Sequence, residues 1–136
     1  METKSYFIYK VTLSQVGYNS VYYDYFGASD ITAIYDYYNN DAIRKIITIE
    51  HLGLLNWADE NFFKSSEEAF SLYEFEYLGK LNSFCNTYVV AKNIQDVHII
   101  AGVDPVKVRI INKIDSIRYI KSFKEMDAEV ERMRIG

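Results

Sequence analysis

The chain contains an internal repeat, and this repeat limits the possible folds more than any other feature of the sequence. Residues 25–52 read YFGASDITAIYDYYNNDAIRKIITIEHL, and residues 88–117 read YVVAKNIQDVHIIAGVDPVKVRIINKIDSI. Ala28 and Ala91 stand 63 positions apart, and many residues after them match in type. Self-similarity of this kind indicates a supersecondary unit that occurs twice. The further aligned pairs are Asp30 with Asn93, Ile31 with Ile94, Ile34 with Val97, Asp41 with Asp104, Arg44 with Lys107, Ile49 with Ile114 and Leu52 with Ile117.

Alternating residues predict a β-hairpin at the start of each copy. Along residues 6–13, successive side chains alternate between two faces, and this alternation is typical of a strand. Residues 15–20, QVGYNS, interrupt the alternation with turn-forming residues, and a second strand is expected over residues 21–27. Strands over residues 72–77 and 86–91 predict a second hairpin of the same kind.

After each hairpin the period changes from two to that of a helix. In the first copy the apolar stripe at i, i+3, i+4 and i+7 consists of Ile31, Ile34, Tyr35 and Tyr38. Ser29 or Asp30 supplies an oxygen that caps the first turn of this helix. The second helix begins after Asn93, and Gly102 is well placed to end it.

Each predicted helix leads into a strand rich in β-branched residues. These third strands are expected over residues 43–52 and 106–117. The tail from Phe123 onward places apolar residues on one face, so we expect a short amphipathic helix there.

The fold class that follows is α+β, with an internal duplication of a ββαβ unit. We expect a mainly antiparallel sheet with two short helices, a C-terminal amphipathic helix and a pseudo-twofold relation between the copies. In each copy the third strand should lie beside the first, which gives the order two, one, three. The single predicted domain divides into a first repeat at residues 5–56, a connector at 57–69, a second repeat at 70–121 and a C-terminal helix at 122–136.

The repeated pattern Y-x-V-x-A-x-[N/D]-I, followed by a helix and a strand ending in I-x-x-I, resembles a group of small phage and mobile-element proteins. In this chain the pattern is carried by Tyr88, Val90, Ala91, Asn93, Ile94, Ile114 and Ile117, with Ala28, Asp30 and Ile31 as the earlier copy. The resemblance implies two hairpin-helix-strand units in a phage-type cytoplasmic protein that acts by binding. It implies no particular activity.

Charge and cysteine content narrow the function classes. A formal net charge of −4 argues against binding to duplex nucleic acid through a general excess of positive charge. Cys85 is the only cysteine, so no disulfide can form within the chain. The start METKSYFIYK lacks the apolar run of a secretory leader, and no stretch has the length of a membrane span. We therefore expect a cytoplasmic protein without a membrane partner.

Catalytic and metal-binding motifs are weakly represented. His51 and His98 have no second ligand at a usual short spacing, and Cys85 has no histidine placed beside it by the predicted topology. The sequence therefore predicts no metal site, no cofactor and no catalytic residue. An enzyme that uses a carboxylate or a histidine ranks third among the hypotheses.

Tyrosine is unusually abundant, with 13 Tyr beside 8 Phe. Tyrosine is enriched at protein interfaces, although a tyrosine-rich sheet packed on a helix explains the same excess. The leading hypothesis is a non-enzymatic protein that binds a host protein or assembles with itself. The alternative is a binder of single-stranded nucleic acid or a nucleotide-like ligand, through stacking tyrosines beside basic residues. The candidate binding residues are Tyr22, Tyr23, Tyr25, Asp36, Tyr37, Tyr38, Trp57, Arg44, Lys107 and Arg109.

Overall fold

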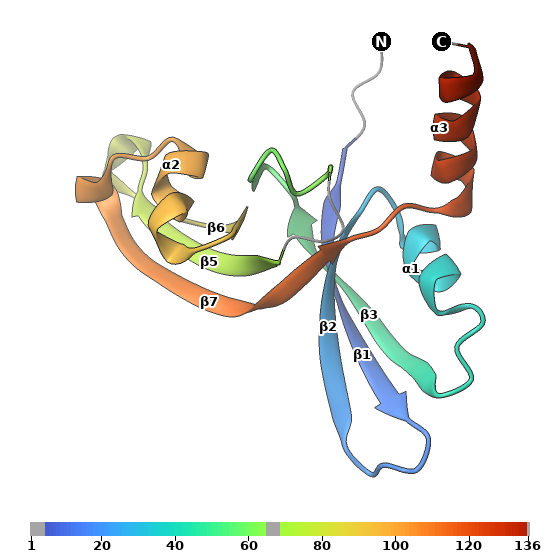
Figure 1. Cartoon of the computed structure of the whole chain (residues 1–136). Coiled ribbons are helices and arrows are strands. Elements are labelled where there is room, and N and C mark those ends of the chain that lie inside the picture. The colour runs from blue at the N-terminus through green and yellow to red at the C-terminus, as the bar shows by residue number, and fades with distance from the viewer. Residues whose placement is uncertain (1–4, 65–68, 136) are drawn as a thin grey trace. The chain divides into compact units, whose positions relative to one another are not determined.

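The computed structural model describes residues 5–64 and 69–135, in which strands and short helices are combined in a mixed α+β fold. The chain divides into two compact units (Figure 1). Unit 1 consists of Met1–Leu54 with Tyr119–Gly136, and unit 2 consists of Leu55–Arg118. The expected single domain with its four segments stays a prediction.

Unit 1 contains a hairpin, a helix and a third strand in the predicted order. β1 (Phe7–Gln15) and β2 (Val21–Ala28) form the hairpin, and α1 (Ile31–Tyr38) leads into β3 (Arg44–Leu54). β1 pairs antiparallel with both β2 and β3, so the strand order two, one, three is confirmed. The chain returns to this unit as α3 (Phe123–Ile135), which confirms the predicted C-terminal helix.

Unit 2 repeats this order of elements, with one addition. β5 (Phe70–Leu78) pairs antiparallel with both β6 (Phe84–Ala91) and β7 (Val108–Tyr119). α2 (Val97–Ala101) lies between β6 and β7 in sequence. The addition is β4 (Trp57–Ala58), which pairs in parallel with β6. The described part of unit 2 also contains short 3₁₀ turns at Lys80–Asn82, Ile94–Asp96 and Pro105–Lys107.

Strand β4 lies in the expected connector, where the sequence predicts no strand. It has only two residues, too few for any periodicity to be visible. The backbone N–H of Asp59 donates to the carbonyl of Val90 and extends the contact with β6. Phe62, also from the connector, is buried. Residues 65–68 of the predicted connector lie outside the described residues.

The third strand of each unit carries β-bulges at corresponding places. On β3, Leu52 and Ile47 have no counterpart in the register with β1. On β7, Ile114 and Arg109 have no counterpart in the register with β5. A bulge adds one residue to one strand of a pair and changes which face the following side chains occupy.

The registers correct the alignment of the third strands. From sequence, Leu52 aligns with Ile117, whereas the bulges place Leu52 in the position that Ile114 occupies in unit 2. Isoleucines recur every two or three positions in both strands, so several alignments match equally well by residue type. No residue pattern in these strands shows where the bulges lie, so the register cannot be predicted from the sequence.

Local chemistry accounts for the ends of the helices. Asp30 caps α1, because its side chain accepts hydrogen bonds from the backbone N–H groups of Thr32 and Ala33. Asn93 has a similar extended backbone but makes no side-chain cap, and the helix there begins as a 3₁₀ turn. Gly102 ends α2 in the left-handed conformation with φ of 68°, as its position predicts.

Each unit has its own apolar core. In unit 1 the buried cluster comprises Tyr9, Val11, Leu13, Phe26, Ala28, Ala33, Ile34 and Tyr38. In unit 2 it comprises Tyr73, Phe75, Val89, Ala91 and Val97. The predicted stripe of α1 is therefore wrong in part, because Ile31 and Tyr35 are exposed while Ala33 is buried. A helix of eight residues buries only a narrow face, and the small Ala33 lies on it.

Candidate functional site

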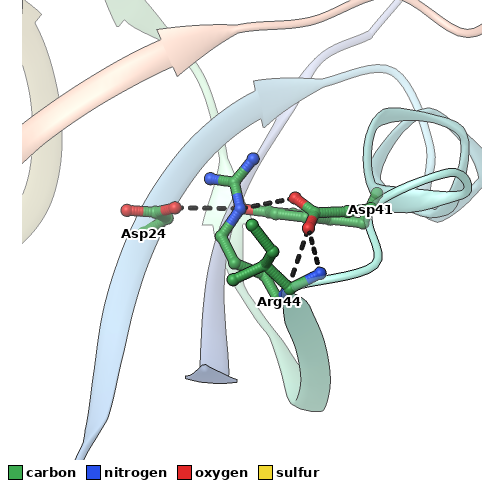
Figure 2. A network of polar contacts seen from close by, with 5 residues as sticks. Asp24, Asp41 and Arg44 are labelled. Carbon is green, nitrogen blue, oxygen red and sulfur yellow. Dashed lines mark hydrogen bonds and ion pairs between the residues drawn. The ribbon is translucent and has the colours of Figure 1, made fainter. Parts of the chain in front are cut away.

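The turn between α1 and β3 is organised by the carboxylate of Asp41. Its Oδ1 accepts hydrogen bonds from the backbone N–H groups of Ile43, at 2.9 Å, and Arg44, at 2.8 Å. Its Oδ2 lies 2.6 Å from Nε of Arg44 (Figure 2). The backbone and side-chain hydrogen bonds from Arg44, followed by that from Ile43, hold the pKa of Asp41 below its usual range. The carboxylate thus fixes both the turn and the direction of the Arg44 side chain.

Arg44 and Tyr38 connect this turn to the sheet. The guanidinium carbon of Arg44 lies 5.1 Å from the centre of the Tyr38 ring, within the range of a cation–π contact. The Tyr38 hydroxyl donates a hydrogen bond of 2.8 Å to Oδ2 of Asp24 on β2. We call Asp24, Tyr38, Asp41 and Arg44 the polar brace, because together they tie β2, α1 and β3 to one another.

The electrostatics of the polar brace suit a structural role better than proton transfer. Burial, and then the hydrogen bond to Asp24, raise the pKa of Tyr38 well above its ordinary value. The side-chain hydrogen bond to Asp41 raises the pKa of Arg44 in the same way. A general acid or base works best with a pKa near the operating pH, and these shifts move both groups away from it.

A shallow depression of about 450 Å³ lies beside the polar brace, where α1 leads into the turn. Its lining combines carboxylates, an amide, an aromatic ring and aliphatic groups. The lining residues are Asp36, Tyr37, Asn40, Asp41, Ala42 and Ile43. Tyr37 and Ile43 are exposed at this depression, whereas the Asp41 carboxylate is engaged in the brace.

Asp36, one of the predicted binding residues, holds α3 in place. Its Oδ2 accepts a hydrogen bond of 3.1 Å from the backbone N–H of Phe123, the first residue of α3. The hydroxyl of Ser122 accepts from the N–H of Glu125, and the Glu125 carboxylate is hydrogen-bonded to Ser29. An N-terminal amide that lacks a partner within its helix is commonly capped by such an oxygen. Asp36 therefore serves the fold, and only its remaining surface faces the depression.

The three predicted tyrosines of β2 do not share a face. Tyr22 pairs with the buried Leu13 and packs against the core of unit 1. Tyr23 and Tyr25 lie on the opposite face of the hairpin, because side chains alternate along a strand. Nζ of Lys10 lies 4.2 Å from the centre of the Tyr23 ring. This second face combines an aromatic ring with a cation.

The other predicted site residues lie in unit 2, whereas Arg44 lies in unit 1. Trp57 is partly buried and meets the ring of Tyr77 edge to face at 6.5 Å. Lys107 is exposed in a 3₁₀ turn. The guanidinium of Arg109 lies 4.4 Å from the centre of the Phe84 ring, and its Nε lies 3.7 Å from the Glu76 carboxylate. Trp57 and Arg109 therefore have partners within unit 2.

An exposed apolar surface at the turn of the first hairpin was not predicted. Val16, Tyr18 and Val21 are 64, 66 and 48% exposed, and Ile43, before β3, is 56% exposed. The backbone N–H of Val16 donates to the carbonyl of Ile43 at 2.9 Å and joins the two segments. We call these four residues the apolar end of unit 1. The sequence signal was present, since Val16 and Tyr18 stand inside the turn QVGYNS.

Two further candidates for chemistry, His51 and Cys85, lie beside aromatic side chains. The His51 ring meets Phe7 at 4.9 Å and Tyr9 at 5.4 Å. Burial, followed by the neighbouring Cys85 thiol, raises the pKa of Tyr77. Among residues 5–64 and 69–135, no group of His, Cys, Asp and Glu side chains is arranged to hold a metal ion. In that same part of the chain, no helix is long and apolar enough to cross a membrane.

Comparison with known proteins adds no relative. No family model, curated protein or solved structure matches the chain. The class defined by the fold is that of small α+β proteins whose strands pair mainly antiparallel. The function must therefore be inferred from the residues of the two units.

Proposed function

We propose that the chain is a non-enzymatic binding protein that recognises a protein partner through unit 1. The binding surface consists of the apolar end, the exposed ring of Tyr37 and the depression beside it. One observation carries the proposal: four apolar side chains stand exposed at one end of the unit, from 48 to 66%. Exposed apolar groups that lie together mark interaction sites more often than isolated ones do.

The polar brace supports this proposal because it stiffens the segment that presents the surface. Ile43 is held on one side by the Asp41 carboxylate and on the other by the Val16 N–H. Both contacts are made by the backbone of Ile43, and a segment whose backbone is already fixed loses less conformational freedom when a partner binds. Tyr37 packs edge to face on the buried Tyr38, with ring centres 4.9 Å apart. The exposed residues thus have rigid support.

We further propose that the two units are copies of one duplicated ββαβ unit. The support is the shared element order, the shared strand order and the two bulges at corresponding places. The pseudo-twofold packing of the copies, the phage or mobile-element origin and the cytoplasmic location stay predictions. So does the choice between a host protein and a second copy as the partner of this surface.

The partner proposal is tested by capture from a lysate of the encoding cell. The immobilised chain is compared with Tyr18→Ser and Ile43→Ser variants, and with Tyr35→Ser as the matched control. Tyr35 is 55% exposed on α1 but lies outside the proposed surface. We expect proteins that the wild type and the control retain and both surface variants lose. Equal capture by all four chains, or capture by none, contradicts the proposal.

A second function is favoured by the opposite face of the hairpin. Tyr23 is 48% exposed, and Lys10 lies over its ring, an arrangement that suits a stacked base and its phosphate. We propose single-stranded nucleic acid or a nucleotide-like ligand as the alternative partner. Fluorescence anisotropy with labelled oligonucleotides at low and moderate salt tests it. Binding that Tyr23→Ser abolishes supports this alternative, and no binding at low salt eliminates it.

A further inference from the structure

Strand β3 presents an unpaired edge. It has 11 residues, and β1 pairs along one side of it. Within the described ranges, no strand pairs along its other side. The N–H and C=O groups of such an edge form a template for hydrogen bonding by another strand. An additional strand can therefore join unit 1 at β3.

Because of the bulge at Ile47, the faces on which residues 45–50 lie follow the same order from either end of the segment. Ile46 and Ile49 face the buried cluster of unit 1, where both are partly buried. Lys45 and Glu50 lie on the opposite face, as their pairing with β1 shows. Between the two isoleucines stands the extra residue Ile47, which is 51% exposed. Lys45 and Glu50, at the two ends of this segment, thus lie on the outer face. Ile46 and Ile49 lie inside them on the inner face, with two residues between them.

We propose that two copies of the chain associate through their β3 edges as an antiparallel pair. In this register Lys45 lies opposite Glu50 of the second copy, and Ile46 lies opposite Ile49 of the second copy. In a regular strand, an even-numbered and an odd-numbered residue point to opposite faces, so this register would oppose inner and outer residues. The extra residue Ile47 removes that mismatch, because it places Lys45 and Glu50 on one face and Ile46 and Ile49 on the other.

Charge and burial both fit a second copy as the occupant. The Lys45–Glu50 contact forms twice about the twofold axis, and oppositely charged residues that face each other across strands are favourable. Within its own chain Glu50 lies opposite Lys10 of β1, but Nζ of Lys10 lies over the Tyr23 ring, and among the described residues neither Lys45 nor Glu50 makes an ion pair. The partly buried Ile46 and Ile49 of each copy extend one core into the other. An unrelated strand would match this order of charges and faces only by coincidence.

This pairing uses an edge of unit 1 and does not depend on the partner proposed for the apolar end. Light scattering after size exclusion, over a series of protein concentrations, measures the association. We expect the wild type to approach twice the 15.9 kDa chain mass. Lys45→Glu and Glu50→Lys each place like charges opposite each other twice. Each should weaken association about tenfold, with an unchanged circular dichroism spectrum.

Mixing the two single variants distinguishes this register from any other contact. The Lys45→Glu chain carries glutamate at both positions, and the Glu50→Lys chain carries lysine at both. Opposite charges therefore meet at both contacts, and the mixture should form a heterodimer as stable as the wild-type dimer. Lys80→Glu and Glu60→Lys, exposed positions in unit 2, are the matched controls and should leave the dimer unchanged. A wild type that stays monomeric at every concentration overturns the proposal. Single variants that dimerise like the wild type, or a mixture that fails to pair, overturn it as well.

Discussion

Replacing Tyr38 by phenylalanine isolates the hydrogen bond at the centre of the polar brace. The substitution removes the hydroxyl that donates to Asp24 over 2.8 Å. It keeps the ring, whose centre lies 5.8 Å from that of Phe26 and 4.9 Å from that of Tyr37. The apolar packing of a side chain that is only 6% exposed is therefore preserved. Any loss of stability then reports the hydrogen bond rather than a cavity.

The expected loss follows from the charge of the acceptor and its partial burial. A hydrogen bond to a charged group contributes about 1.5 to 3 kcal/mol. Because Asp24 is only partly buried, we take the lower end, about 1.5 kcal/mol, which is about tenfold in the unfolding equilibrium. Urea unfolding followed by circular dichroism measures it. Tyr35→Phe, on the exposed side of the same helix, is the control and should cost less than about 0.5 kcal/mol.

The pH dependence of the same variant gives a second measurement. The folded-state pKa of Tyr38 is raised above the ordinary value of 10.0. The stability contributed by this shift is complete below pH 10 and is lost as the pH rises above it toward the folded-state pKa. The wild type should therefore lose stability above pH 10 more steeply than Tyr38→Phe. Equal costs for the Tyr38 and Tyr35 variants, together with parallel alkaline profiles, would refute the reasoning.

Three further predictions concern the turns and caps. Asp30→Ala should cost about 1 kcal/mol of unfolding free energy, because it removes the cap of α1. Asn93→Ala, which removes no side-chain cap, should cost clearly less in the same urea titration, and equal costs would contradict the capping argument. Asp41→Asn should flatten the loss of stability at acid pH. The lowered pKa of Asp41 contributes stability above the unfolded value of 3.8 that disappears as the pH falls, so acid titrations of wild type and variant should converge. Gly79→Ala should lower the melting temperature, because its Cβ would stand 2.6 Å from Sγ of Cys85. Adding Cys85→Ala should restore much of the loss, and no restoration would place the strain elsewhere.

Sequence patterns predicted what depends on local chemistry. The bounds of α1, its cap at Asp30 and its successor strand follow from residues that are neighbours along the chain. The strand order in each unit followed from the right-handed crossover that contains the helix, because it lays the third strand beside the first. The end of α2 followed from Gly102, because glycine adopts the left-handed conformation with little strain.

Features that depend on distant residues were not predictable. The hydrogen bond between Tyr38 and Asp24 requires α1 to lie against β2 at one particular height, and no local pattern encodes that height. Asp36 was singled out for binding, yet it caps a helix whose first residue, Phe123, is far away in sequence. The bulge at Ile47 shifts the register by one residue, which periodicity averages over a strand cannot detect.

Comparing corresponding positions in the two units separates what the fold requires from what it does not. Asp104 repeats the turn of Asp41, since its Oδ1 accepts from the N–H of Val106. This cap is found in both units and therefore belongs to the fold.

The rest of the polar brace occurs in unit 1 alone. By the spacing of 63 positions, Asp24 corresponds to Thr87 and Tyr38 to Ala101, and Ala101 has neither the hydroxyl nor the ring through which Tyr38 joins the network. Unit 2 nevertheless forms the same strand order and the same bulges without it. The brace is thus an addition that this fold does not need in order to form. Because it holds the segment that carries Ile43, the binding surface that we propose at the apolar end would give this stiffening a role.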